Sequence, residues 1–133
     1  MKAATLKSVQ VAVEEIPYQD ASRDIWDTKY RLKQKDGTVV DETIDQTYQR
    51  VAHALADVEG SEALRIEWEK KFLWALRHGA IPAGRIVSNA GAQAYKPATS
   101  TINCTVSGTV EDSMDNILDK VHEAGLTLKA GCG

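Results

Sequence analysis

The sequence predicts a mainly α-helical chain with a few short strands. In three segments the apolar residues recur at helical spacing, and each of these segments begins with a residue that caps helices. In contrast, the stretch 81–108 has no helical period and contains two of the three prolines. We therefore divide the chain into a helical N-terminal region, 1–80, and a second region, 81–133.

Composition and charge exclude several functions. The 133 residues are 43% hydrophobic and 26% charged, and the net charge of −3 gives no basis for a nucleic-acid or anionic-membrane surface. No apolar run approaches the roughly 20 residues that span a bilayer, and the N-terminus is a poor signal peptide. We expect a cytoplasmic protein with neither a membrane nor a nucleic-acid partner.

The cysteines and histidines indicate neither a disulfide framework nor a metal site. Cys104 and Cys132 are too few for a framework and form no CxxC pair. The three histidines are scattered, whereas a zinc site needs about four clustered ligands. On residue type alone, both cysteines are interpreted as small buried apolar residues.

The first 42 residues give weaker signals. Residues 9–13 alternate weakly, which fits either a short strand or an ordered arm. Asp36-Gly37 is a strong turn signal between two short runs that could pair as strands. The residues of the segment 22–32 that we expect to be buried are Ile25, Trp26 and Tyr30.

Residues 43–60 and 61–79 are expected to form two helices that pack as an antiparallel pair. Thr43 and Gln46 fit a capping box at the start of the first helix, and Ser61 can cap the second. The apolar stripe of the first helix is Ile44, Tyr48, Val51, Ala52, Leu55 and Val58. The stripe of the second is Leu64, Trp68, Phe72, Ala75 and Leu76.

Two short strands are predicted in the stretch that follows. Residues 85–87 read as a brief strand, and residues 100–106 alternate and are rich in β-branched side chains. Cys104 lies in the second of these strands. Between them, residues 88–92 are small or turn-forming, which lets the backbone approach a ligand closely.

The last predicted helix begins at Thr109, with Asp112 completing a capping box, and ends at Lys129. It is followed by a glycine-rich turn at 130–133. Because such a turn normally leads into a further element, we expect the chain to be one piece of a larger protein. The apolar stripe of this helix is Val110, Met114, Ile117, Leu118, Val121, Ala124 and Leu128.

Six short motifs follow one another with consistent gaps: IWDTKYRL at 25–32, DETI at 41–44, PAGRI at 82–86, NC at 103–104, DSM at 112–114 and AGCG at 130–133. No single motif is specific, but the ordered set resembles the N-terminal portion of ribonucleotide reductases. The resemblance is greatest to the adenosylcobalamin-dependent class, and it covers about residues 22–133.

The resemblance implies helices followed by the first elements of a ten-stranded α/β barrel, in which a thiyl radical starts the reduction of a ribonucleotide. Cys104 matches one of two cysteines that deliver electrons and become a disulfide, which a dithiol reductant restores. The second cysteine, the radical cysteine and the adenosylcobalamin contacts would lie in the remainder of the reductase chain. Cys132 matches neither cysteine and receives no redox role.

The resemblance also implies nucleotide contacts. Ser88 matches a hydroxyl residue at the substrate phosphate, and Asn103 matches a position that contacts the ribonucleotide through its backbone. Gly131 matches a glycine that lies against the nucleotide. Asp112, Ser113 and Met114 match the start of the site that binds a deoxynucleotide or ATP effector. Helix capping is the alternative role for Asp112 and Ser113, and both roles can hold together.

Other interpretations stay open. A stand-alone helical binding or regulatory module would keep the scaffold without catalysis, and an exposed apolar face on the last helix would count against it. An iron-dependent reductase would keep the role of Cys104 but would use a radical-generating subunit. The chain alone is expected to be inactive, whether it is a split-gene product, an excised fragment or a segment before an intein. The sequence leaves open whether the substrate is a diphosphate or a triphosphate.

Overall fold

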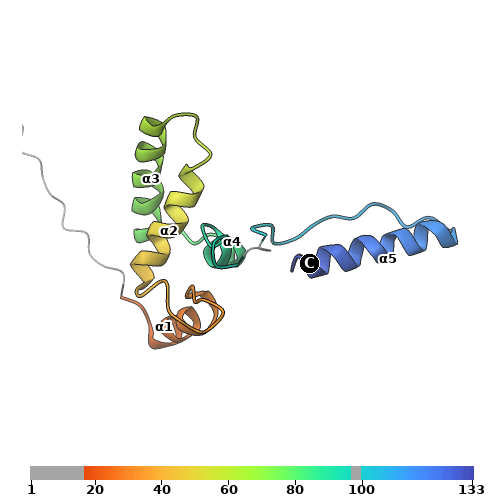
Figure 1. The fold of residues 1–133 in the computed structure, drawn as a ribbon, viewed down its shortest axis with the longest axis horizontal. Helices are drawn as coiled ribbons and strands as arrows, with labels where there is room; N and C mark the ends of the chain where they lie inside the picture. The colour runs from red at the N-terminus through yellow and green to blue at the C-terminus, as the bar shows by residue number, and fades with distance from the viewer. Residues whose placement is uncertain (1–16, 97–99) are drawn as a thin grey trace, which may run out of the picture.

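The computed structural model describes residues 17–96 and 100–133, and Figure 1 shows their arrangement. Their helices are α1 (Asp20–Ile25), the π-helical turn η1 (Trp26–Tyr30), α2 (Ile44–Ala56), α3 (Glu62–Arg77), α4 (Gly84–Asn89) and α5 (Met114–Lys129). The mainly helical fold class is confirmed. The predicted strand or arm at 9–13 lies outside the described residues, and the boundary at 80/81 stays a prediction.

The helices α2 and α3 pack side by side as an antiparallel pair, as the sequence predicts (Figure 1). The start of α2 meets the end of α3, where Arg77 Nε and Nη2 donate to Asp45 at 2.6 and 2.7 Å. Further along, the His53 ring lies 3.0 Å from the Glu69 carboxylate. The core between the helices is small, and its buried members are Val51, Ala52, Leu76 and Ala90.

The caps predicted for α2 and α3 are both present. The Thr43 hydroxyl accepts from the Gln46 backbone N–H at 3.2 Å, and the Gln46 side chain accepts from the Thr43 N–H, which completes the capping box. Ser61 caps α3 by accepting from the Leu64 N–H at 3.3 Å. The predicted apolar stripes are only partly correct, since Val58 and Leu64 are exposed.

Replacing Thr43 by alanine should lower the free energy of unfolding by about 1 kcal/mol, because a first-turn N–H loses its partner. Urea denaturation followed by circular dichroism would measure the change. Thr43→Ser keeps the hydroxyl and should stay within about 0.5 kcal/mol of the wild type. Equal losses in both variants would show that the capping hydroxyl contributes nothing.

The segment before α2 contains a helical turn and one antiparallel bridge. Of the three anchors predicted here, Ile25 is 48% exposed, so its predicted burial is wrong, whereas Trp26 and Tyr30 are half-buried. The Asp36-Gly37 turn is confirmed, with Gly37 at φ +89°. Its two flanks pair through one isolated antiparallel bridge, Lys33–Val39, and no further pair of described residues extends the bridge into a ladder.

The strand predicted at 85–87 and the predicted start of the last helix are both wrong. Residues 85–87 lie in α4, where the Ala83 carbonyl accepts from the Ile86 and Val87 N–H groups. The cap of the last helix lies four residues later than predicted, at Ser113 instead of Thr109, because the Ser113 hydroxyl accepts from the Asn116 N–H at 3.3 Å. Among the described residues, no helix has the length and hydropathy needed to cross a membrane.

Candidate functional site

Arg50 of α2 holds the end of α4. Its Nη2 donates to the Val87 carbonyl at 3.0 Å, and its Nη1 donates to the Ala90 carbonyl. Both carbonyls lie at the end of a short helix, where the last carbonyls have no partner within the helix. Nη2 also pairs with an Asp41 oxygen at 2.8 Å, and the two side chains are 9% and 4% exposed. The ion pair therefore neutralises a buried charge, and the two carbonyl bonds fasten α4 to α2.

The Asp41 carboxylate is the centre of a longer network. It accepts from the Thr47 hydroxyl at 2.7 Å, and that hydroxyl accepts from the Trp26 indole at 3.0 Å. Arg31 Nε donates to the backbone carbonyl of Asp41 at 2.8 Å. Because buried polar groups are costly unless they are bonded, this fully paired network fixes η1, α2 and α4 relative to one another.

Ser88 lies on α4, between the two carbonyls that Arg50 holds. The side chain is half-buried, and its only described bond is a long one of 3.5 Å to the Arg85 carbonyl. The Lys96 ammonium donates to the Ser88 carbonyl at 3.4 Å. Burial lowers the pKa of Lys96, and nearby Arg50 lowers it further. Ser88 and Lys96 therefore lie together at the C-terminal end of α4.

A short contact ties α4 to the segment that carries Cys104. The buried Asn89 side chain donates to the Ser100 carbonyl at 2.7 Å. Beyond it, the Gly133 N–H donates to the Asn103 carbonyl at 3.2 Å, and the Thr105 N–H donates to the Gly133 carbonyl at 2.9 Å. This is the bonding pattern of a parallel bridge opposite Cys104. The strand predicted at 100–106 is not present among the described residues, since the backbone of this segment pairs only with Gly133.

The two cysteines lie in different environments. Cys104 is exposed and free, so its interpretation as a buried apolar residue is wrong. Cys132 is buried at 5% exposure, and its thiol donates to the Ile102 carbonyl at 3.2 Å. An exposed thiol is open to thiol–disulfide exchange, whereas a buried and bonded one is not.

Gly131 lies against the guanidinium of Arg85, which extends from α4. A Cβ at Gly131 would be 2.8 Å from Arg85 Cζ, and the φ of +78° disfavours any other residue. The structure thus brings Gly131 to α4 and brings Cys104 to the neighbouring Gly133. Four of the predicted substrate residues gather around α4 and the turn after α5: Ser88, Asn103, Cys104 and Gly131.

A second glycine is tied to α4 by geometry. Gly91 has φ +71°, and a Cβ there would lie 2.8 Å from Arg50 Cγ and 3.1 Å from the Arg50 carbonyl oxygen. Gly91→Ala should therefore cost at least about 1–2 kcal/mol of unfolding free energy, measured by urea denaturation. Gly37→Ala is the matched control, because Gly37 also has a positive φ, +89°, and a Cβ there meets nothing within 4 Å. Equal effects would remove the close approach of Gly91 as the cause.

A family model described as the all-alpha domain of ribonucleotide reductase matches residues 17–95, more than half of the chain. The chain belongs to this family. The match spans α1 to α4, including the Arg50–Asp41 pair and Ser88, and ends before Cys104. No curated protein and no solved structure matches the chain.

The predicted effector residues of this reductase chain lie at the start of α5. Asp112 and Met114 are exposed, and Ser113 caps the helix, so the alternative capping role holds for Ser113 and not for Asp112. The 16 residues of α5 span about 24 Å, which separates these residues from Gly131 at the other end. Their role in binding an effector stays a prediction.

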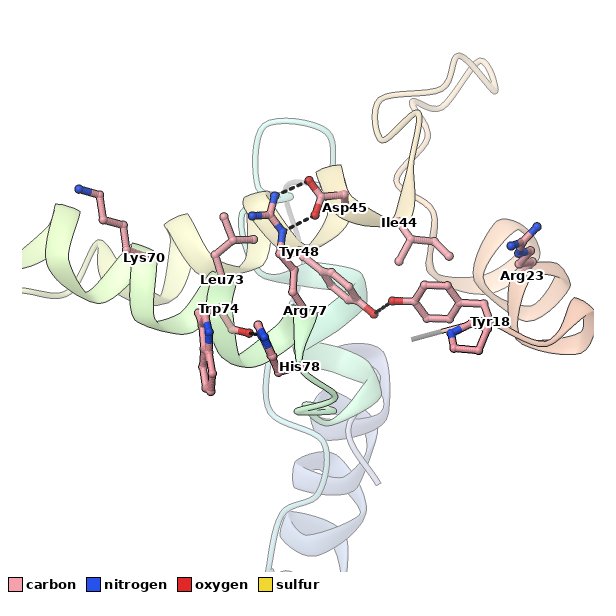
Figure 2. A pocket seen from close by; sticks show the side chains of 11 residues that line it. Tyr18, Arg23, Ile44, Asp45, Tyr48, Lys70, Leu73, Trp74, Arg77 and His78 are labelled. Atoms are coloured by element: carbon pink, nitrogen blue, oxygen red, sulfur yellow. Dashed lines mark hydrogen bonds and ion pairs between the residues drawn. The ribbon is translucent and has the colours of Figure 1, made fainter. Parts of the chain in front are cut away.

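A groove of about 990 Å³ lies elsewhere in the reductase domain, between α1, α2 and α3 (Figure 2). Its polar groups largely bond to one another: the Tyr18 and Tyr48 hydroxyls are 2.6 Å apart, and Arg77 is paired with Asp45. Burial, followed by the bond to Tyr18, raises the pKa of Tyr48. The groove contains none of the predicted site residues, so its size does not make it the reaction site.

The sequence did not reveal Asp41, Arg50 and Lys96 as parts of the site. Each is a charged residue, and the residues next to it in the sequence do not show whether its side chain is buried in an ion pair or exposed to solvent. The one signal was the DETI motif, which contains Asp41. Among the described residues, no group of three or more His, Cys, Asp or Glu side chains could hold a metal ion.

Proposed function

We propose that this chain is the N-terminal part of an adenosylcobalamin-dependent ribonucleotide reductase and that Cys104 is one of its two reducing cysteines. In the net reaction, a C–O bond of the ribose breaks, a C–H bond forms and the hydroxyl leaves as water. Two thiols supply two electrons and two protons and become a disulfide. An external dithiol then reduces that disulfide by exchange.

Membership of the reductase family and the position of Cys104 support this proposal. The thiol is exposed, and its backbone lies opposite Gly133, so a nucleotide against Gly131 would be close to it. Ser88 and Lys96 would hold the phosphate, and Asn103 would contact the substrate through its backbone. The effector, a deoxynucleotide or ATP, would bind at the start of α5, at Asp112, Ser113 and Met114.

The exposed apolar face of α5 is the observation that carries the proposal against a stand-alone module. Within the described residues, α5 packs along no other helix and extends away from the α2–α3 pair (Figure 1). Contiguous apolar surface of this kind marks an interaction site. In a reductase, the barrel would cover it. The exposed residues are Met114, Ile117, Leu118, Val121 and Leu128.

In this proposal the cobalamin site lies outside this chain, because the family resemblance assigns the cobalamin contacts to the remainder of the reductase. Adenosylcobalamin would supply the radical that starts the reaction. The contribution of this chain is to hold the nucleotide and to supply one thiol, in a cytoplasmic enzyme of deoxyribonucleotide synthesis.

The test is ribonucleotide reduction after this chain is mixed with a separately expressed remainder of the reductase, adenosylcobalamin and a dithiol. Activity that needs both pieces and the cobalamin supports the proposal. Activity that instead needs a radical-generating subunit would assign the iron-dependent class. A folded chain that fails to bind the remainder would favour the stand-alone module.

A further inference from the structure

We propose that Arg50, held by Asp41, is the positioning residue of the substrate site. Its guanidinium fixes α4 and thereby places Ser88 and, through Asn89, the segment that carries Cys104. This inference rests on the proposed function for the roles of Ser88 and Cys104. The part of it that concerns α4 can be tested without turnover.

Arg50 bonds to backbone carbonyls on both sides of Ser88. The Val87 carbonyl, one residue before Ser88, accepts from Nη2 at 3.0 Å, and the Ala90 carbonyl, two residues after it, accepts from Nη1. A helix as short as α4 has little stability of its own. Its orientation therefore depends on contacts of this kind with the larger α2–α3 pair.

The guanidinium is itself held by the Asp41 carboxylate. Nε lies 3.3 and 3.2 Å from the two Asp41 oxygens, and Nη2 lies 2.8 Å from Oδ2. Thr47 donates to the same carboxylate, so the carboxylate is fixed too. Arginine suits this place because its rigid fork reaches a carboxylate and two carbonyls at once, which a lysine ammonium at a single point does not.

Asn89 connects α4 to the segment that carries Cys104. Asn89, next to Ser88, is 7% exposed and donates to the Ser100 carbonyl at 2.7 Å. Four residues later the chain reaches Cys104, whose backbone is bracketed by the bonds to Gly133. A shift of α4 would therefore move the phosphate-side hydroxyl and the thiol together.

The test compares Arg50→Lys with Arg77→Lys. Arg77 is the matched control, since it also pairs through two bonds with an aspartate of α2, Asp45, but has no described contact with α4. Hydrogen exchange of the full chain, read by mass spectrometry, should be roughly tenfold faster at residues 84–92 in Arg50→Lys and unchanged at 62–77. Exchange at 84–92 that matches the wild type would overturn the proposal.

The second readout is kinetic and uses the enzyme assembled with the remainder of the reductase. Arg50→Lys should raise the KM for the ribonucleotide about tenfold and lower kcat, whereas Arg77→Lys should change neither. A purely structural role would lower the melting temperature of Arg50→Lys without changing KM below that temperature. Unchanged KM and kcat in Arg50→Lys would overturn the positioning role.

The two proposals fail in different ways. If the wild-type assembly has no activity, the proposed function is wrong, and hydrogen exchange alone decides whether Arg50 holds α4. If the wild type is active and Arg50→Lys has wild-type kinetics, the positioning role is wrong while the proposed function stands.

Discussion

Replacing Cys104 by serine should reduce turnover of the assembled reductase by roughly 10³-fold or more, because serine forms no disulfide and supplies no electrons. Folding should be little affected. The side chain is exposed, and surface substitutions usually change stability by less than about 0.5 kcal/mol. Initial rates with a dithiol reductant, measured beside urea denaturation of the same preparations, would separate the two effects.

Cys132→Ser is the matched control for Cys104→Ser. The Cys132 thiol is buried and donates to the Ile102 carbonyl, a bond that a serine hydroxyl can also make. Turnover should therefore persist in this variant. Survival of dithiol-driven turnover in Cys104→Ser, or its loss in Cys132→Ser alone, would show that the redox role has been given to the wrong cysteine.

Removing the Asp41 carboxylate should cost about 3–5 kcal/mol of unfolding free energy, because Arg50 would keep a buried charge without its partner. Arg50 is 9% exposed at its side chain, and Thr47 would lose an acceptor as well. Urea denaturation of Asp41→Ala measures the loss. Asp41→Asn keeps one acceptor oxygen and should cost less, about 1–3 kcal/mol, which gives a second reading if Asp41→Ala does not fold.

A double variant checks the cause of that loss. When Arg50→Met accompanies Asp41→Ala, the buried charge is gone, so the double change should cost clearly less than the sum of the two single changes. Additive costs would mean that the carboxylate and the guanidinium act independently. An Asp41→Ala chain within about 1 kcal/mol of the wild type would contradict the buried pair itself.

Local chemistry determines how much of this fold is readable from the sequence. The α2–α3 pair was predicted because Thr43, Gln46 and Ser61 satisfy first-turn donors within a few residues of themselves. The start of α5 was misplaced because two capping patterns compete there. Ser113 wins, and Asn116 bonds back to the Glu111 N–H at 2.8 Å.

The remaining errors concern contacts between distant residues. Ile86 and Val87 favour a strand by propensity, but Arg50, nearly 40 positions earlier, bonds the carbonyls at the end of the helix they form. The strand propensity of a residue takes no account of a partner so far away in the sequence. The candidate substrate residues were predicted from motif resemblance, whereas the Asp41–Arg50 pair that holds α4 is seen only in the folded structure.

The bond between Trp26 and Thr47 gives this molecule an optical reporter. The indole ends the chain of hydrogen bonds that runs through Asp41 to α4. The other two tryptophans, Trp68 and Trp74, lie on α3. With both replaced by phenylalanine, the fluorescence of Trp26 alone would follow whether water reaches the Asp41–Arg50 pair. Movement of the helix that carries Ser88 could then be followed in real time, without a measurement of catalytic activity.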